Sequence, residues 1–154
     1  MSINNKALFL GAIFSLIAAL AHLAVIIGGP DWYRAFGAGE DMARLAASGS
    51  SYPATVTLMI ATILFIWSMY GFSGAGLIRR LPLLRLALVF ISAVYLLRGL
   101  LAVPVVMLVD SPYLNELQQN ITFMLVSSFI CLLIGICYAL GTAQAWSELK
   151  KKKP

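Results

Sequence analysis

The chain contains little charge and few residues of the kinds that build metal or redox sites. Charged residues make up 11% of its 154 residues, against roughly 25% in soluble domains, whereas hydrophobic residues make up 61%. This balance excludes a water-soluble fold. The net charge of +5 does not indicate nucleic-acid binding, because the basic residues stand in short runs beside apolar segments. We therefore expect an integral membrane protein with a lipid bilayer, and no nucleic acid, as its partner.

Cysteine and histidine are too scarce for metal chemistry. Cys131 and Cys137 lie six residues apart in the last apolar segment, so they do not form a CxxC pair and are expected to be apolar fillers of a helix. His22 is the only histidine, and no carboxylate cluster has the spacing of a metal site. No metal, no cofactor and no catalytic residue is therefore assigned.

Four apolar segments reach the length of about 20 residues that crosses about 30 Å of hydrocarbon. They are Ala7–Gly28, Pro53–Ile78, Leu83–Val109 and Ile121–Ala145. We expect a single all-α membrane domain, an antiparallel four-transmembrane-helix bundle with a short amphipathic outer loop over residues 29–52 and a tail over residues 146–154. The first segment also imitates a signal peptide, but its apolar residues continue past the cleavage-like Ala19–Ala21 to a full spanning length.

The basic residues predict the orientation of the spans, because short cytoplasmic loops are enriched in lysine and arginine. Arg34 and Arg44 lie on one side of the predicted membrane. Eight basic residues lie on the other side: Lys6, Arg79, Arg80, Arg85 and Lys150–Lys153. We therefore predict a multi-pass protein of the cell inner (plasma) membrane with both termini in the cytoplasm.

The outer loop is amphipathic. Trp32, Tyr33 and Phe36 share one helical face by i, i+3 and i+4 spacing, and tryptophan and tyrosine concentrate where a bilayer meets water. Glycines at positions 37 and 39 should break this helix, after which Glu40 and Arg44 have the i, i+4 spacing of an ion pair. The pattern predicts two short interfacial helices. They form either an ordinary connector or a lid that completes a binding pocket.

Two stretches of the sequence carry a resemblance to known proteins. The run from His22 through Gly28–Arg34 to Phe36–Glu40, followed by Gly74–Pro82, resembles small bacterial four-span inner-membrane proteins without an assigned activity. The resemblance implies a bacterial location and four spans, and it transfers no functional residue. The four spans with a few polar residues in the outer half are also similar, in architecture alone, to the sterol isomerase and sigma-2 receptor superfamily.

Arg98 stands inside the third span, where an ionisable side chain is costly and suggests a function. Both Arg98 and His22 lie sixteen residues, or about 24 Å of helix, from the cytoplasmic boundary. Tyr95 lies one turn before Arg98. Thr57–Thr62 in the second span and Ser127 and Ser128 in the fourth lie at a similar depth. One interpretation is a polar pocket below the lid, in which Arg98 binds an anionic group and His22 and Tyr95 direct hydrogen bonds. Trp32, Glu40 and Ser127 complete the candidate ligand-binding set.

Other interpretations of these polar residues stay open. Arg98 also suits snorkelling to outer phosphate groups, and serine or threonine hydroxyls often bond the backbone of their own helix. His22 also suits simple packing with one hydrogen bond. In the second span, Ser68, Gly71 and Ala75 form a small-residue face, which favours close helix packing within the bundle or between protomers.

Three functions remain compatible with the sequence. The first is a small membrane protein that binds an apolar or lipid-like small molecule, or acts as an accessory subunit in a homo-oligomer or with a membrane partner protein. The second is an enzyme acting on a lipid or sterol-like substrate, with His22 or Glu40 as proton carrier. The third is a structural subunit of a larger membrane complex.

Overall fold

Four long helices make up most of the protein. The computed structural model describes residues 5–110, 114, 118 and 120–150, apart from the side chains at positions 148 and 150. The long helices are α1 (Lys6–Gly28), α4 (Tyr52–Gly74), α5 (Leu84–Leu108) and α7 (Ile121–Gln144), and each is long and apolar enough to cross a membrane. The described residues contain no strand. The predicted four-helix membrane fold is therefore confirmed.

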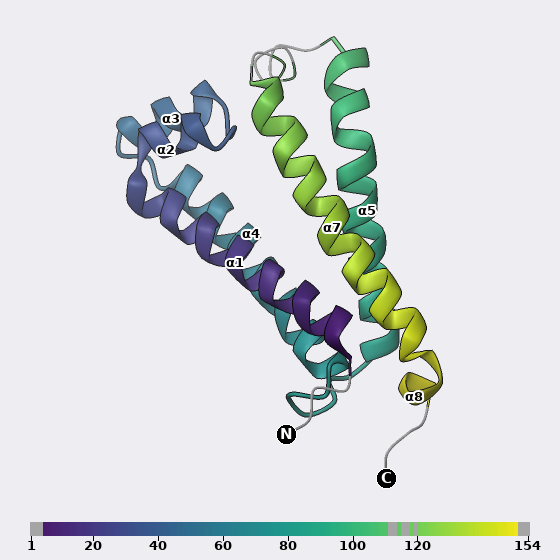
Figure 1. The fold of residues 1–154 in the computed structure, drawn as a ribbon. Coiled ribbons are helices and arrows are strands. Elements are labelled where there is room, and N and C mark those ends of the chain that lie inside the picture. Colours follow the sequence, from purple (N-terminus) through teal and green to yellow (C-terminus); the bar gives the residue numbers. More distant parts are fainter. Residues whose placement is uncertain (1–4, 111–113, 115–117, 119, 151–154) are drawn as a thin grey trace.

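The long helices are arranged as two antiparallel pairs. Helix α1 packs on α4, and α5 packs on α7. The pairs lie side by side at the end that carries both termini and diverge toward the opposite end (Figure 1). We call these the termini end and the lid end. The outward-facing side chains are largely apolar, with Ile27 88% exposed and Leu108 83% exposed, which suits a bilayer around the helices.

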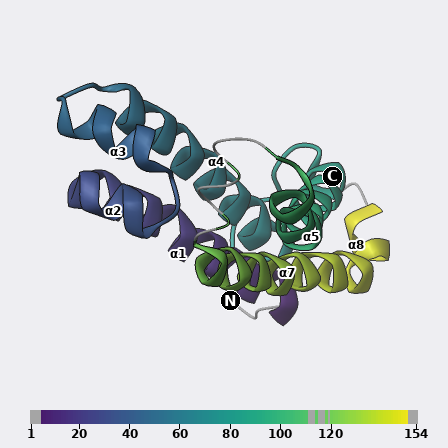
Figure 2. The same ribbon diagram turned by 90° about the horizontal axis from the view of Figure 1, so that it is seen from above.

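Three short helices also lie within the described residues. At the lid end, α2 (Pro30–Ala35) and α3 (Glu40–Ala47) lie side by side over the ends of α1 and α4 (Figure 2), and we call this pair the lid. At the termini end, α8 (Trp146–Lys150) follows α7. The predicted loop 110–120 and the lysines at positions 151–153 fall mostly or wholly outside the described residues.

Glycines set the ends of three helices. Helix α4 ends at Gly74, whereas hydropathy alone predicts that the span runs to Ile78. Gly76 has a φ of 82°, and its amide donates to the carbonyl of Ser73 while the amide of Leu77 donates to Phe72. This Schellman motif satisfies the last carbonyls and stops the helix, although the residues beyond it stay apolar. Gly37 and Gly49 end α2 and α3 in the same way.

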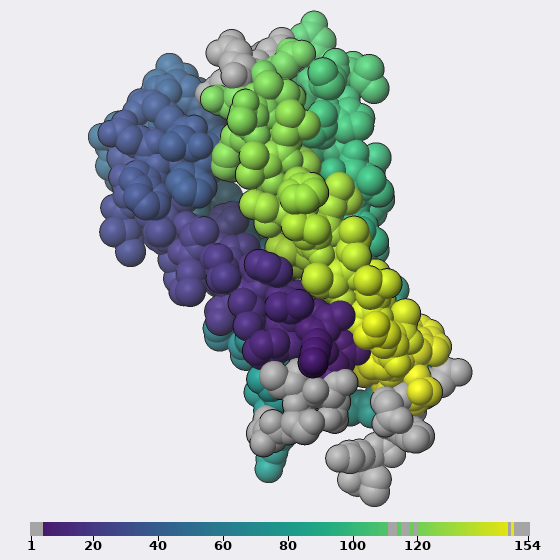
Figure 3. Space-filling view, in the orientation of Figure 1, coloured from purple at the N-terminus to yellow at the C-terminus, as the bar shows by residue number. Residues whose placement is uncertain are grey.

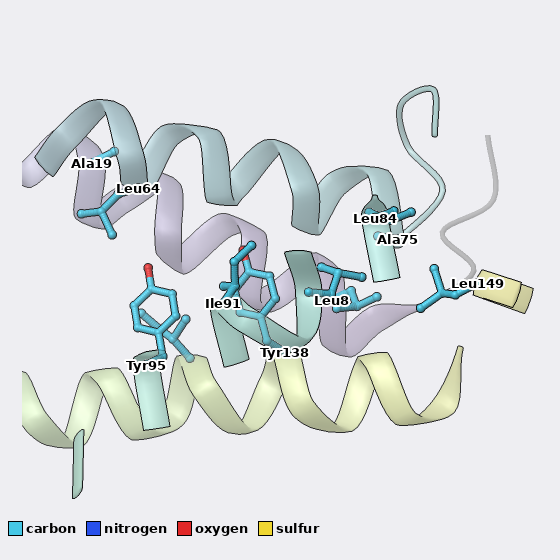
Figure 4. Packing of buried hydrophobic residues seen from close by; sticks show 11 residues of the cluster. Leu8, Ala19, Leu64, Ala75, Leu84, Ile91, Tyr95, Tyr138 and Leu149 are labelled. Carbon is cyan, nitrogen blue, oxygen red and sulfur yellow. The ribbon is translucent and has the colours of Figure 1, made fainter. Parts of the chain in front are cut away.

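The main hydrophobic core lies where the two pairs meet, toward the termini end (Figure 4). Leu8, Leu88 and Ile134 come from three different helices and are almost completely buried. Asn5 fastens α1 to α7: its Nδ2 donates to the carbonyl of Gly141 at 2.8 Å, and its Oδ1 accepts the amide of Leu8 at 2.9 Å. This side chain both caps α1 and joins the two helix pairs.

Helices α5 and α7 approach closely through two reciprocal glycine contacts. A Cβ on Gly99 would lie 2.6 Å from Cγ of Leu132, and a Cβ on Gly135 would lie 2.9 Å from Cγ of Leu96. Each leucine fills the space that the facing glycine leaves. The absence of two side chains therefore fixes the register of this pair.

Candidate functional site

All four long helices meet at a buried polar junction. The Ser15 hydroxyl on α1 lies 3.0 Å from the hydroxyl of Tyr95 and 3.2 Å from that of Tyr138. The Tyr138 hydroxyl donates to the carbonyl of Trp67 on α4 at 2.9 Å. Figure 4 shows both tyrosine hydroxyls pointing toward α1. The two tyrosine rings stack at 6.0 Å, and Trp67 packs edge-on against Tyr95 at 5.2 Å.

The direction of the hydrogen bonds at this junction follows from proton counting. A hydroxyl has one proton, and a carbonyl can only accept. Tyr138 gives its proton to Trp67, so Ser15 must donate to Tyr138 and Tyr95 must donate to Ser15. A directed chain of three bonds thus links the two helix pairs. The junction lies within the span, where water is not available as a hydrogen-bond partner. These bonds therefore satisfy polar groups that would otherwise have no partner.

Arg98 lies three residues, about one turn, beyond Tyr95 toward the lid end, so the two residues are neighbours on one side of α5. Its side chain is exposed, and its Nη1 donates to the hydroxyl of buried Ser128 at 3.3 Å. Ser128 lies seven residues, or about 10 Å, from the start of α7. The guanidinium therefore stays well inside the span, which disfavours the interpretation that it snorkels to the lid end. No described carboxylate contacts it.

His22 lies two turns from Ser15 toward the lid end, and the i, i+7 spacing places both on one face of α1. Its Nδ1 lies 2.8 Å from the carbonyl of Ala18. Because a carbonyl only accepts, Nδ1 is the donor of this bond, and Nε2 is the ring nitrogen left for another partner. This Nε2 has no hydrogen-bond partner among the described residues.

Hydroxyls nearer the lid end bond their own helices. Ser127 donates to the carbonyl of Met124 at 3.1 Å, and Thr62 donates to that of Leu58 at 2.8 Å. Of the hydroxyls predicted at this depth, Ser128 contacts Arg98, whereas Ser127 and Thr62 do not. Both the Ser127 and the Thr62 hydroxyl instead bond the backbone of their own helix, as the alternative interpretation predicts.

The lid has its own small core and reaches across to the second helix pair. Tyr33 is buried against Val25 and Ala43. Trp32 stacks on Phe36 at 5.6 Å, and Phe36 meets Phe123 of α7 edge-on at 6.2 Å. In the space-filling view the lid lies against α7 (Figure 3). The diverging pairs are thus bridged on this face by aromatic contact.

An ion-pair clasp joins the two lid helices. Arg34 donates to both carboxylate oxygens of Glu40, at 2.7 and 2.9 Å, and to Asp31 at 2.9 Å. Helical spacing predicts Arg44 as the partner of Glu40. Arg44 does attract the Glu40 carboxylate and also pairs with Asp41, but the bidentate partner of Glu40 is Arg34. Arg34 lowers the pKa of Glu40, and Glu40 in turn raises the pKa of Arg34. Glu40 therefore closes the lid and has both oxygens engaged.

The lid clasp should open only in acid. The pKa of Glu40 in the folded lid lies below the ordinary 4.5. The ionised carboxylate therefore stabilises the lid fully above pH 4.5, and this stabilisation is lost as the pH falls through the folded pKa. After correction for the intrinsic pH dependence of amide exchange, we expect the protection of the amides in α2 and α3 to stay constant above pH 4.5 and to fall as the pH drops below 4.5. Glu40→Gln should remove this acid step and speed exchange at neutral pH. Asp41→Asn is the matched control, and an unchanged acid step in Glu40→Gln would disprove the clasp.

The small-residue face of α4 is covered by α1. Ser68 and Ala75 are completely buried, and a Cβ on Gly71 would lie 2.7 Å from Cβ of Ala12 and 2.8 Å from the Tyr138 hydroxyl. Ser68 donates to the carbonyl of Phe65 at 2.7 Å. The face is therefore occupied within the chain, and a separate protein partner would need another surface.

The six predicted ligand-binding residues do not form one cluster. Arg98 and Tyr95 lie on α5, His22 on α1, Ser127 on α7, and Trp32 and Glu40 in the lid, and no hydrogen bond in the described part joins any two of them. Sequence reasoning missed Ser15, Tyr138 and Arg34. The residues described contain no cluster of histidine, cysteine and carboxylates that suits a metal. No protein-family model, curated protein or solved structure matches the chain.

Proposed function

We propose that the protein binds a lipid-like molecule with an anionic group, which enters from the bilayer between the two helix pairs near the lid. The observation that carries this proposal is the position of Arg98. Its guanidinium lies inside the span, exposed, with the neutral hydroxyl of Ser128 as its described partner. A permanent positive charge at this depth is costly unless an anion offsets it.

The chemistry of the guanidinium suits a carboxylate or a phosphate. Arginine has five N–H donors in a planar fork, and one of them reaches Ser128. The remaining donors match two oxygens of one anionic group. The apolar surfaces of the diverging pairs suit the hydrocarbon part of the same molecule.

Two polar groups near the lid end support directional binding. Nε2 of His22 can accept a hydrogen bond from a ligand hydroxyl. Tyr33 has a buried hydroxyl without a hydrogen-bond partner among the described residues, so it can donate one. Trp32 and Phe36 of the lid lie on one side of these groups, and the junction at Ser15 lies on the other, toward the termini end.

We further propose that the protein lies in the cell inner (plasma) membrane, with the lid end facing outward and both termini in the cytoplasm. The excess of lysine and arginine at the termini end supports this orientation. The ligand would then come from the outer leaflet. An enzyme is the alternative, and its proton carrier would be His22, because Arg34 holds Glu40 ionised.

Oleate and its neutral analogue oleyl alcohol are suitable probes. We expect oleate to raise the thermal unfolding temperature of the purified protein in detergent more than the alcohol does. Arg98→Gln should weaken oleate binding about tenfold and leave the alcohol unaffected, because one charged hydrogen-bonded contact is lost. Arg79→Gln, at an exposed arginine of the termini end, is the matched control. An equal oleate effect in wild type and Arg98→Gln would exclude the proposed site.

A further inference from the structure

A groove lies at the termini end, on the side of the bundle formed by α5, α7 and α8. It consists of two neighbouring cavities of about 530 and 520 Å³ that share Val89 and Trp146. The first is mainly apolar and also borders Ser92, Ala139, Thr142 and Ala143. The second borders the turn before α5 and the first turn of that helix, including Arg80 and Arg85.

Two arginines give the second cavity a positive wall. The guanidinium carbon of Arg85 lies 3.7 Å from the ring centre of Trp146. Stacking uses the face of the guanidinium and leaves its N–H edge available for oxygen acceptors. Arg80 donates to the carbonyl of Leu149 and borders the same cavity. None of the described side chains that line the groove is acidic.

The N-terminus of α5 opens on this cavity. Its N-cap residue, Leu83, has a φ of 51° and offers no side-chain cap. The amides of Leu84–Leu86 therefore lack an acceptor within the helix, and they lie at the positive end of a 25-residue helix. Such amides bind phosphate oxygens. Leu83 and Leu86 are 75% and 65% exposed, so the first turn is also positioned to contact hydrocarbon.

Thr142, which borders the apolar cavity, carries an unsatisfied hydroxyl. Thr142 is only 4% exposed, and its buried hydroxyl has no hydrogen-bond partner among the described residues. A buried donor without a partner is costly, and an ester carbonyl would satisfy it. Ser92, which borders the same cavity, is already bonded to the carbonyl of Leu88 at 2.7 Å.

We propose that this groove binds one anionic phospholipid from the leaflet at the termini end. Arg80, Arg85 and the first amides of α5 hold the phosphate. Thr142 donates to an acyl ester carbonyl, and the chain lies over Val89 and Ala139. Basic pockets between membrane helices bind anionic head groups in this way. The site is separate from the one proposed at Arg98, and neither proposal depends on the other.

The test uses the full-length protein in nanodiscs of phosphatidylcholine and phosphatidylglycerol, with retained lipid read by native mass spectrometry. We expect the wild type to retain one phosphatidylglycerol in preference to phosphatidylcholine. Arg80→Gln and Arg85→Gln should each reduce this preference about tenfold. Arg79→Gln makes the same charge change at an exposed neighbour outside the groove, so it should retain the lipid, as should Arg98→Gln.

The competing explanations give different results. Equal loss in Arg79→Gln would mean general surface attraction and would overturn the proposal. Displacement of the lipid by millimolar inorganic phosphate would mean a site for free phosphate and would also overturn it. Val89→Trp fills the groove without changing its charge and should expel the lipid, so it tests the site even if Arg85→Gln fails to fold. Thr142→Val should weaken retention several-fold at nearly constant volume.

Discussion

Tyr138→Ala should destabilise the protein by about 3–5 kcal/mol, the cost typical of removing a large buried aromatic side chain. Tyr138 is the largest fully buried side chain in the described structure. Its ring packs against Gly11, where a Cβ would lie 3.0 Å from it, and stacks on Tyr95. The substitution would leave a cavity at the point where all four long helices meet.

The loss of the ring and the loss of the hydroxyl can be separated. Tyr138→Phe keeps the ring but removes the bonds to Ser15 and Trp67. Hydrogen bonds between membrane helices contribute about 0.6–1.7 kcal/mol, so this variant should lose about 1 kcal/mol. Tyr95→Phe removes only the first bond of the chain and should lose no more than Tyr138→Phe does.

Reversible unfolding in mixed micelles gives the free energies, and spin labels report the angle between the helix pairs. Labels at Thr55 and Leu101, in a background without Cys131 and Cys137, lie on different pairs. Their distance distribution should broaden in Tyr138→Ala and stay narrow in Tyr138→Phe. A narrow distribution in both variants would show that the junction does not set the divergence of the pairs.

The positions of the long helices were predictable because hydropathy and length decide them almost alone. The lid helices were predictable because glycines at positions 37 and 39 interrupt an amphipathic pattern. The end of α4 was not predictable from hydropathy. The Schellman motif at Gly76 stops the helix while the following Leu77 and Ile78 remain as apolar as a span.

The site was less predictable, because depth in a membrane does not determine contact. His22 and Arg98 lie at similar predicted depth, but they belong to different pairs that diverge toward the lid end (Figure 1). Which helices pair is a tertiary property with no local pattern. The bond between Ser15 and Tyr138 spans 123 residues, and each residue alone resembles an ordinary member of a membrane helix. Arg34 reaches Glu40 across a turn, so helical spacing does not reveal the pair.

Gly71→Ala should destabilise the protein by about 1–3 kcal/mol, because one added methyl group overpacks a site that cannot relax. The new Cβ would lie 2.7 Å from Cβ of Ala12, 3.1 Å from its Cα and 2.8 Å from the Tyr138 hydroxyl. Two of these three atoms are the Cα and Cβ of Ala12, which can move only if helix α1 moves. The third holds the hydrogen bond to Trp67, so α1 must shift or that bond must lengthen.

Gly74→Ala, one turn further along α4, is the matched control. Its new Cβ would meet Cδ1 of Leu8 at 2.8 Å and Cδ1 of Leu88 at 3.0 Å, which are the ends of flexible side chains. These methyl groups can rotate aside, and alanine favours a helix over glycine by about 1 kcal/mol. Gly74→Ala should therefore change the unfolding free energy by less than about 1 kcal/mol. If both variants lose the same free energy of unfolding, the close approach of Ala12 and Tyr138 to Gly71 is not the cause of its loss.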